Sequence, residues 1–285
     1  MESKLYLLAT EPYLSPLQEV TKAPTSVYIA GKLPLTRFPS VAIVGTRRPT
    51  PYGKEVTHRL AYDLAKRGVA IISGLALGVD AIAHQAALDA GGTTIAVLGN
   101  GLDHIYPSRN QQLGKQIVKK GGALLSEYPP SMPALAHHFL ARNRLVSGLA
   151  DAVIVTEAAA RSGTLSTVNH ALEQGKDVFV VPGNITSLLS IGPNRLLQQG
   201  AHPALSVDDI LEIIAPHLLK DAPEPVIGSN PAETRILKLI QSGVRNGDQL
   251  QEQSKLEASE FSQALTMLEI NGDIRALSGN QWTIR

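Results

Sequence analysis

Short apolar runs alternate with amphipathic stretches through most of the chain. The apolar runs lie at residues 41–44, 69–72, 94–98, 123–125, 152–155 and 178–181. They are continuous rather than alternating, which is typical of strands buried on both faces of a parallel sheet. The stretches between and after them predict helices near 53–67, 79–90, 108–120, 137–148, 164–174 and 207–214. This order predicts an α/β fold, with a doubly wound parallel sheet covered by helices on both faces.

The segments on either side of this pattern differ from it. Residues 1–37 contain Pro12, Pro16, Pro24 and Pro34, and we expect an irregular N-terminal extension whose residues 5–8 pack on the main domain. The main domain is expected over 38–218, a linker rich in proline over 219–230, and a second domain over 231–285. In that second domain, helices are predicted near 231–241, 246–253 and 257–270, followed by a hairpin of 274–277 with 282–284. Three helices followed by a hairpin indicate a winged-helix domain.

Composition narrows the class of protein. The chain has 285 residues, of which 44% are hydrophobic, so one large and one small domain can each have a core. There is no cysteine, which excludes disulfides, a thiol nucleophile and a zinc site built on cysteine. The N-terminus lacks a signal-peptide pattern, and no apolar run approaches the roughly 20 residues that cross a bilayer. We therefore expect a cytoplasmic protein with no membrane contact.

The charge balance limits how nucleic acid could be bound. The net charge is +1, whereas a general polyelectrolyte binder is strongly basic, so any such site must be local. Residues 231–285 carry six basic and seven acidic side chains, a net charge of −1. Winged-helix and related modules that grip duplex DNA present a basic face. We expect the C-terminal domain to contact protein, or to bind DNA only weakly.

Candidate chemistry lies in the turns that follow the predicted strands. Ligands of open parallel sheets bind beyond the carboxyl ends of the strands. The turns there, at 45–53, 73–80, 99–107, 157–164 and 182–184, are rich in glycine and small polar residues. Glycines allow close approach, and helix N-termini favour anions. A tight turn alone would explain any one of them, but five on one edge, with Arg47 and Arg161 among them, predict a phosphate-binding face.

The sequence gives little support for a dinucleotide site, a catalytic site or a metal site. No GxGxxG follows the first strand, no Walker motif is present, and no Ser–His–Asp or HExxH pattern supports Asp80 and Glu157 as an acid–base pair. His137 and His138 are neighbours and would face different ways on a helix, which disfavours a metal site. We expect no cofactor and no metal. The spacing of Arg142-Asn143-Arg144 fits a solvated helix face as well as it fits the phosphate edge.

Several motifs resemble the DNA processing protein A (DprA/Smf) family, in that family's order. They are Val44-Gly45-Thr46-Arg47, Ser73-Gly74-Leu75-Ala76-Leu77-Gly78-Val79-Asp80, Gly99-Asn100-Gly101-Leu102-Asp103 with Tyr106-Pro107, Arg142-Asn143-Arg144 with Ser147-Gly148-Leu149, Glu157-Ala158 with Ser162-Gly163-Thr164-Leu165, and Val181-Pro182-Gly183-Asn184. The resemblance covers about residues 20–215, and the tail resembles the winged-helix domain of many members. Many members also carry a helical domain before this region, which we do not expect here.

The resemblance implies a Rossmann-like fold and a function. Members bind single-stranded DNA, form homodimers, protect incoming strands during natural transformation and help to load the RecA recombinase, without being enzymes. Arg47 and Arg161 match basic positions of the family's DNA pocket. The DNA-binding residues expected here are Gly45, Thr46, Arg47, Arg48, Ser73, Gly74, Gly78, Asn100, Gly101, Arg142, Asn143, Arg144, Arg161, Ser162, Gly163 and Thr164.

Two alternative functions and one accessory feature remain open at this point. A nucleotide phosphoribohydrolase on a related fold would use similar glycine-rich turns. A mononucleotide-binding regulator with a winged-helix output would also suit the two domains. Base stacking, which single-strand binders use, has Tyr52 and Phe139 as its candidates near the phosphate edge.

Overall fold

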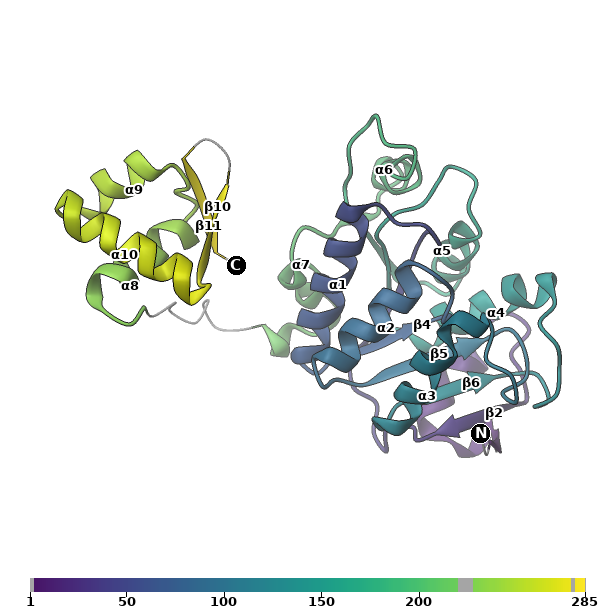
Figure 1. Ribbon diagram of the computed structural model, residues 1–285. Helices are drawn as coiled ribbons and strands as arrows, with labels where there is room; N and C mark the ends of the chain where they lie inside the picture. Colours follow the sequence, from purple (N-terminus) through teal and green to yellow (C-terminus); the bar gives the residue numbers. More distant parts are fainter. Residues whose placement is uncertain (1–2, 220–227, 278–279, 285) are drawn as a thin grey trace. The chain divides into compact units, whose positions relative to one another are not determined.

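The computed structural model describes residues 3–219, 228–277 and 280–284. The chain divides into two compact units, Met1–Leu219 and Lys220–Arg285 (Figure 1). Most of the predicted linker, residues 220–227, lies outside the described residues, as do residues 278, 279 and 285 of the second unit. Each unit is considered by itself.

A mixed sheet forms the centre of the first unit. In the described residues it has nine strands in the order β1-β2-β6-β5-β4-β3-β7-β8-β9. Their bounds are β1 Lys4–Leu7, β2 Ser26–Gly31, β3 Ser40–Val44, β4 Ala70–Ser73, β5 Thr94–Leu98, β6 Ala123–Ser126, β7 Ala152–Val155, β8 Asp177–Val180 and β9 His202–Pro203. The strands from β6 to β9 in this order pair in parallel, whereas β1 and β2 are antiparallel. The six predicted strands are all confirmed.

Helices cover both faces of this sheet (Figure 1). One face carries α1 (Pro51–Lys66), α2 (Val79–Asp89), α3 (Gln111–Lys119) and α7 (Val207–Ile214); the other carries α4 (Ala136–Leu149), α5 (Thr164–Glu173), α6 (Ile191–Gln198) and the 3-10 segment η2 (Pro12–Gln18). Successive strand residues point to opposite faces. Accordingly Val41 and Ile43 of β3 pack with the first group of helices, and Ala42 and Val44 with the second. The doubly wound α/β architecture is confirmed.

The structure corrects two expectations and adds elements that the sequence did not predict. Residues 1–37 are not irregular, because they supply β1, β2 and the 3-10 segments η1 (Leu8–Thr10) and η2. In β2, Val27 and Ile29 are buried while Tyr28 is half-buried, an alternation that the surrounding prolines obscured. The helix expected near 108–120 begins as a 3-10 turn, η3 (Ser108–Asn110), before α3. The helix α6, the short edge strand β9 and the 3-10 turn η4 (Pro216–Leu218) were not predicted.

The second unit has the predicted order of elements. It contains α8 (Pro231–Gln241), α9 (Gly247–Ser254), α10 (Ala258–Asn271), β10 (Ile274–Leu277) and β11 (Gln281–Ile284). Its core is aliphatic, with Trp282 packed against it. The sequence of α10 contains Glu260 and Glu269 but no lysine or arginine. In the parts of the chain that the structure describes, no helix combines the length and apolarity needed to cross a membrane.

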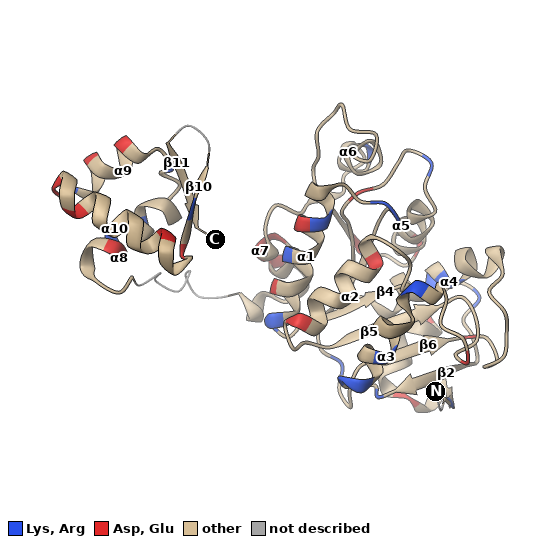
Figure 2. Cartoon of the chain, viewed as in Figure 1, with Lys and Arg blue, Asp and Glu red and all other residues tan. Residues whose placement is uncertain are grey.

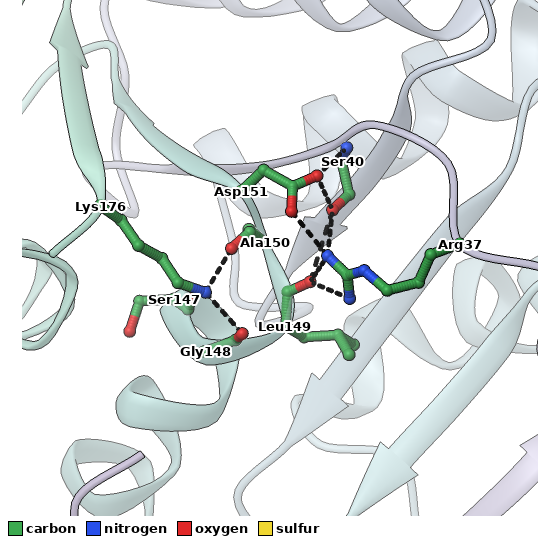
Figure 3. Close-up of polar contacts among 8 residues, drawn as sticks. All are labelled: Arg37, Ser40, Ser147, Gly148, Leu149, Ala150, Asp151 and Lys176. Carbon is green, nitrogen blue, oxygen red and sulfur yellow. Dashed lines mark hydrogen bonds and ion pairs between the residues drawn. The ribbon is translucent and has the colours of Figure 1, made fainter. Parts of the chain in front are cut away.

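A group of polar contacts holds the C-terminal end of α4 against the start of β7 (Figure 3). The Lys176 ammonium donates to the carbonyl oxygens of Ser147, at 2.8 Å, and Gly148, at 2.6 Å, and also to that of Ala150. The guanidinium of Arg37 forms an ion pair with the carboxylate of Asp151, the first residue after Ala150, with 2.7 Å between Nη2 and Oδ1. The last carbonyls of a helix have no partner within it and attract cations. Burial lowers the pKa of Lys176 to about 8, which leaves it mostly protonated at neutral pH.

We expect Lys176→Met to lower the free energy of unfolding of the first unit by about 1–3 kcal/mol. Methionine keeps most of the buried stem but removes the donors, so the helix-end carbonyls lose a cationic partner. Urea denaturation followed by far-UV circular dichroism measures the change, with the exposed Lys54→Met on α1 as the matched control. Equal stability of the two variants would contradict this role of Lys176.

Candidate nucleic-acid interface

A cleft of about 350 Å³ opens beyond the carboxyl ends of β3 and β7. These strands are neighbours in the sheet, but the chain leaves β3 toward β4 on one side and reaches β7 on the other. Such a switch point separates the two following turns and leaves a crevice, where ligands of open α/β sheets bind. The walls come from the turns after β3, β4 and β7, from α4 and from the start of α5.

Two guanidinium groups stand at the mouth of this cleft. Arg47 follows β3 and Arg161 precedes α5; both side chains line the cleft and both residues are exposed. Within the described residues, neither takes part in an ion pair. Figure 2 shows basic segments on the loops beside α5 within a chain that is largely uncharged. Two cations that line one cleft without an ion-pair partner among the described residues form a site for an anion.

The third cation of the cleft, Arg142, is buried in its floor. Its residue is 5% exposed, and its Nη1 donates to the carbonyl oxygen of Gly74 at 2.8 Å and to that of Val97. Burial lowers the pKa of Arg142 to about 10, with Asp80 opposing the shift and Arg47 adding to it. Arg142 therefore stays protonated at neutral pH. It ties the turn after β4 to the end of β5 and places a positive charge beneath the cleft.

The two carboxylates considered for acid–base chemistry are held by structural contacts. Asp80 is buried and accepts from the amides of Gly74, at 3.1 Å, and Ala76, at 3.3 Å. Burial raises the pKa of Asp80, and the charge of Arg142 counteracts this. Glu157 is 2% exposed and accepts from the Thr50 amide at 2.8 Å and its hydroxyl at 2.6 Å, at the N-cap of α1. Each carboxylate fixes a turn that shapes the cleft.

The glycines of the cleft serve different purposes. A Cβ on Gly74 would lie 2.4 Å from the Arg142 guanidinium, and one on Gly45 would lie 2.7 Å from the Val79 side chain, so both permit close packing of the protein itself. Gly78 has a φ of +79°, and a Cβ added there would clash with the backbone of Thr46 and Arg47.

Only open space and Leu140, at 4.0 Å, face the Cβ position of Gly163. Gly163, at the N-cap of α5, is thus the glycine of this group that leaves room for a ligand.

The structure brings together ten of the expected binding residues in the cleft. They are Gly45, Thr46, Arg47, Gly74, Arg142, Asn143, Arg161, Ser162, Gly163 and Thr164. Arg48 is exposed outside its walls, and Gly78 lies behind the turn of Arg47. The Arg144 side chain is turned away and pairs with Glu127 at 2.6 Å.

The remaining expected residues are parts of the scaffold. Ser73 is buried and its hydroxyl donates to the Ile43 carbonyl at 2.7 Å. The Asn100 amide donates to the carbonyl oxygens of Gly101, at 2.9 Å, and His104, at 2.6 Å. A Cβ on Gly101 would meet backbone oxygens at 2.1 Å. These three residues shape the turns after β4 and β5 and do not line the cleft.

The structure also shows cleft residues that the sequence did not single out as binding residues. Leu140 and Thr167 line it together with Phe139, which was only a stacking candidate. All three lie on α4 or α5, where helical periodicity does not distinguish a cleft wall from a core face. His138 stacks on Tyr128 with ring centroids 3.9 Å apart. No cluster of three or more metal-binding side chains occurs among the residues with described positions.

Fold and cleft together define a Rossmann-like protein that has a basic crevice at its switch point and a separate winged-helix domain. The family model for DNA recombination-mediator protein A matches residues 4–215, and that for the DprA winged helix domain matches 220–280. The chain therefore belongs to the DNA recombination-mediator protein A (DprA/Smf) family.

Three relatives illustrate the similarity. Protein Smf of Escherichia coli K12 is 39% identical over 284 residues, which cover 97% of this chain and 76% of that protein. The X-ray structure of DNA processing protein A from Streptococcus pneumoniae superposes with a TM-score of 0.69 at 40% identity, covering 75% of each chain. The Helicobacter pylori protein, described for its single-stranded DNA binding mode, has a TM-score of 0.66 at 35% identity, covering 74% of this chain and 95% of its own.

Proposed function

We propose that the cleft binds the sugar–phosphate backbone of single-stranded DNA. The observation that carries this proposal is the convergence of Arg47, Arg161 and the N-terminal end of α5 on one open crevice. Guanidinium groups and the amides of a helix N-terminus both favour phosphate. Arg142 adds a charge from below without occupying the space. Binding through the backbone is tolerant of sequence and sensitive to salt.

A single strand suits this cleft better than a duplex. A duplex needs a broad basic surface, whereas this chain has a net charge of +1 and its free cations at the cleft are few. In the second unit, α10 occupies the place in the winged-helix order that usually enters the major groove, yet it has glutamates and no cation. The Helicobacter pylori relative, described by its single-stranded DNA binding mode, supports the same choice.

The family supplies the wider role that we propose. The protein would protect incoming single strands during natural transformation, act as a homodimer in the cytoplasm and help to load RecA. We propose no catalytic step, because Asp80 and Glu157 are occupied by scaffold contacts. The C-terminal domain, acidic overall, is proposed to contact protein.

A binding titration at two salt concentrations tests the proposal. We expect labelled oligothymidine to bind much more tightly than a duplex of equal length, with an affinity that falls as salt rises. Fluorescence anisotropy measures both. Equal affinity for the duplex would contradict a strand-specific cleft, and release of free base from nucleoside monophosphates would favour the phosphoribohydrolase function instead.

A further inference from the structure

Among the described residues, the exposed side chains of the Trp, Tyr and Phe type lie at the edge of the sheet that carries the cleft. The sequence contains 1 Trp, 7 Tyr and 4 Phe. Of these, Tyr52 and Tyr106 are the most exposed, at 48% and 50% of their surface, and the others are buried or half-buried. A tyrosine ring offers a flat apolar face for contact with a ligand, and both of these rings lie on the edge that carries the cleft.

Tyr106 stands on the side of the cleft nearer to β5. It lies in the turn after β5, and its ring is 5.4 Å from that of Phe139, at an angle of 38°. Phe139 in turn lines the cleft and packs against Gly99, the first residue after β5. Phe139 therefore joins the cleft, which it lines, to the solvent-exposed ring of Tyr106.

Tyr52 stands on the opposite side, at the end of β8. It is the second residue of α1, and its hydroxyl donates to the carbonyl oxygen of Pro182 at 2.8 Å, which fixes the ring over the turn after β8. A second hollow beside it is lined by Thr50, Glu157, Pro182 and Asn184. The hydroxyl is occupied by this bond while half of the side chain stays exposed, as expected of a ring fixed for contact with a ligand.

The strand order places the cleft between these two rings. Along the sheet the order is β5-β4-β3-β7-β8, with Tyr106 after β5, the arginines after β3 and β7, and Tyr52 over β8. Four steps between strands correspond to about 19 Å. A single strand can cover that span with several nucleotides, and every base has a face that can stack on an aromatic ring.

We propose that Tyr106, backed by Phe139, and Tyr52 are base-stacking platforms at the two ends of the cleft, so that a single strand runs across the carboxyl edge of the sheet from β5 to β8. Arg47 and Arg161 hold phosphates in the middle, and the two rings hold bases at the ends. This inference rests on the proposed function, because it needs the strand to occupy the cleft.

Two probes of equal length separate stacking from phosphate binding. One is oligothymidine; the other has the same backbone with abasic tetrahydrofuran sugars, which keep every phosphate but remove every base. Stacking contributes about 1–3 kcal/mol per base, so we expect Tyr106→Leu and Tyr52→Leu each to weaken oligothymidine binding by about 5- to 150-fold. Neither variant should change binding of the abasic probe or the salt dependence.

Matched variants control for changes in folding. Tyr62→Leu removes a half-buried ring from α1, about 15 Å along the helix from Tyr52, and should leave both affinities unchanged. Tyr106→Phe and Tyr52→Phe keep the stacking ring and should retain most of the affinity for oligothymidine. Circular dichroism verifies that each variant is folded.

The outcomes distinguish this inference from the proposed function. If Tyr106→Leu or Tyr52→Leu leaves the oligothymidine affinity unchanged, or weakens both probes equally, the two-ended path is wrong. Arg47→Ala should weaken both probes. If it does so while the tyrosine variants have no effect, only the stacking inference fails; if Arg47→Ala binds both probes as the parent does, the proposed cleft itself fails.

Discussion

Replacing Arg47 by alanine should weaken the binding of single-stranded DNA by about 1.5–3 kcal/mol, or roughly 10- to 150-fold. The side chain lines the cleft, is exposed and has no ion-pair partner within the described part of the chain, so its loss should remove the proposed phosphate contact without breaking an ion pair of the fold. Each phosphate contact contributes about 0.7 to the slope of log affinity against log salt for single strands, so that slope should fall by about this amount.

The neighbouring arginines provide the controls for this prediction. Arg161→Ala should behave like Arg47→Ala, because its side chain lines the same cleft and is also exposed. Arg48 is also exposed and adjacent in sequence but does not line the cleft, so Arg48→Ala should weaken the binding of single-stranded DNA much less. Anisotropy titrations over a salt series measure all three. An equal loss for Arg48→Ala would indicate a diffuse electrostatic effect in place of a defined cleft.

A second large effect is expected on stability. Arg142→Met should lower the free energy of unfolding of the first unit by about 3–5 kcal/mol, because the buried Arg142 guanidinium offsets the charge of the buried Asp80 carboxylate and its removal leaves that carboxylate uncompensated. Here the uncompensated groups are the Asp80 carboxylate and the carbonyl oxygens of Gly74 and Val97. The total free energy of unfolding of a native domain is only about 5–15 kcal/mol, so we expect partial unfolding of this variant at moderate temperature.

The design of this measurement uses the single tryptophan. Trp282 lies in the second unit, so its fluorescence follows that unit, whereas far-UV circular dichroism follows both. We expect Arg142→Met to lower the denaturation midpoint of the dichroism signal and to leave that of the fluorescence signal unchanged. The double variant Arg142→Met with Asp80→Asn removes both charges and should recover part of the loss. A loss below about 1 kcal/mol in the single variant would contradict the structural role of Arg142.

The sequence predicted most of the scaffold because the relevant signals are local. A continuous apolar run such as 94–98 can only be buried on both sides, and it forms β5 over the same residues. The turn glycines and Arg47 were placed on one edge by the rule that parallel strands end together. The order of the helices and the hairpin in the second unit was also predicted from the sequence, because each of these elements has its own hydrophobic period and its own turn residues.

What the sequence alone determined is therefore the set of elements, their alternation and the edge on which the chemistry lies. The tertiary structure alone decided that β2 joins the sheet beside β6, since that pairing depends on residues far apart in the chain. It also decided which arginine of Arg142-Asn143-Arg144 enters the cleft: Arg142 lies in its floor, while Arg144 turns to Glu127. Residues two apart on a helix point in different directions, and which of these faces the cleft is set by how α4 packs on the sheet, a long-range outcome that no local pattern encodes.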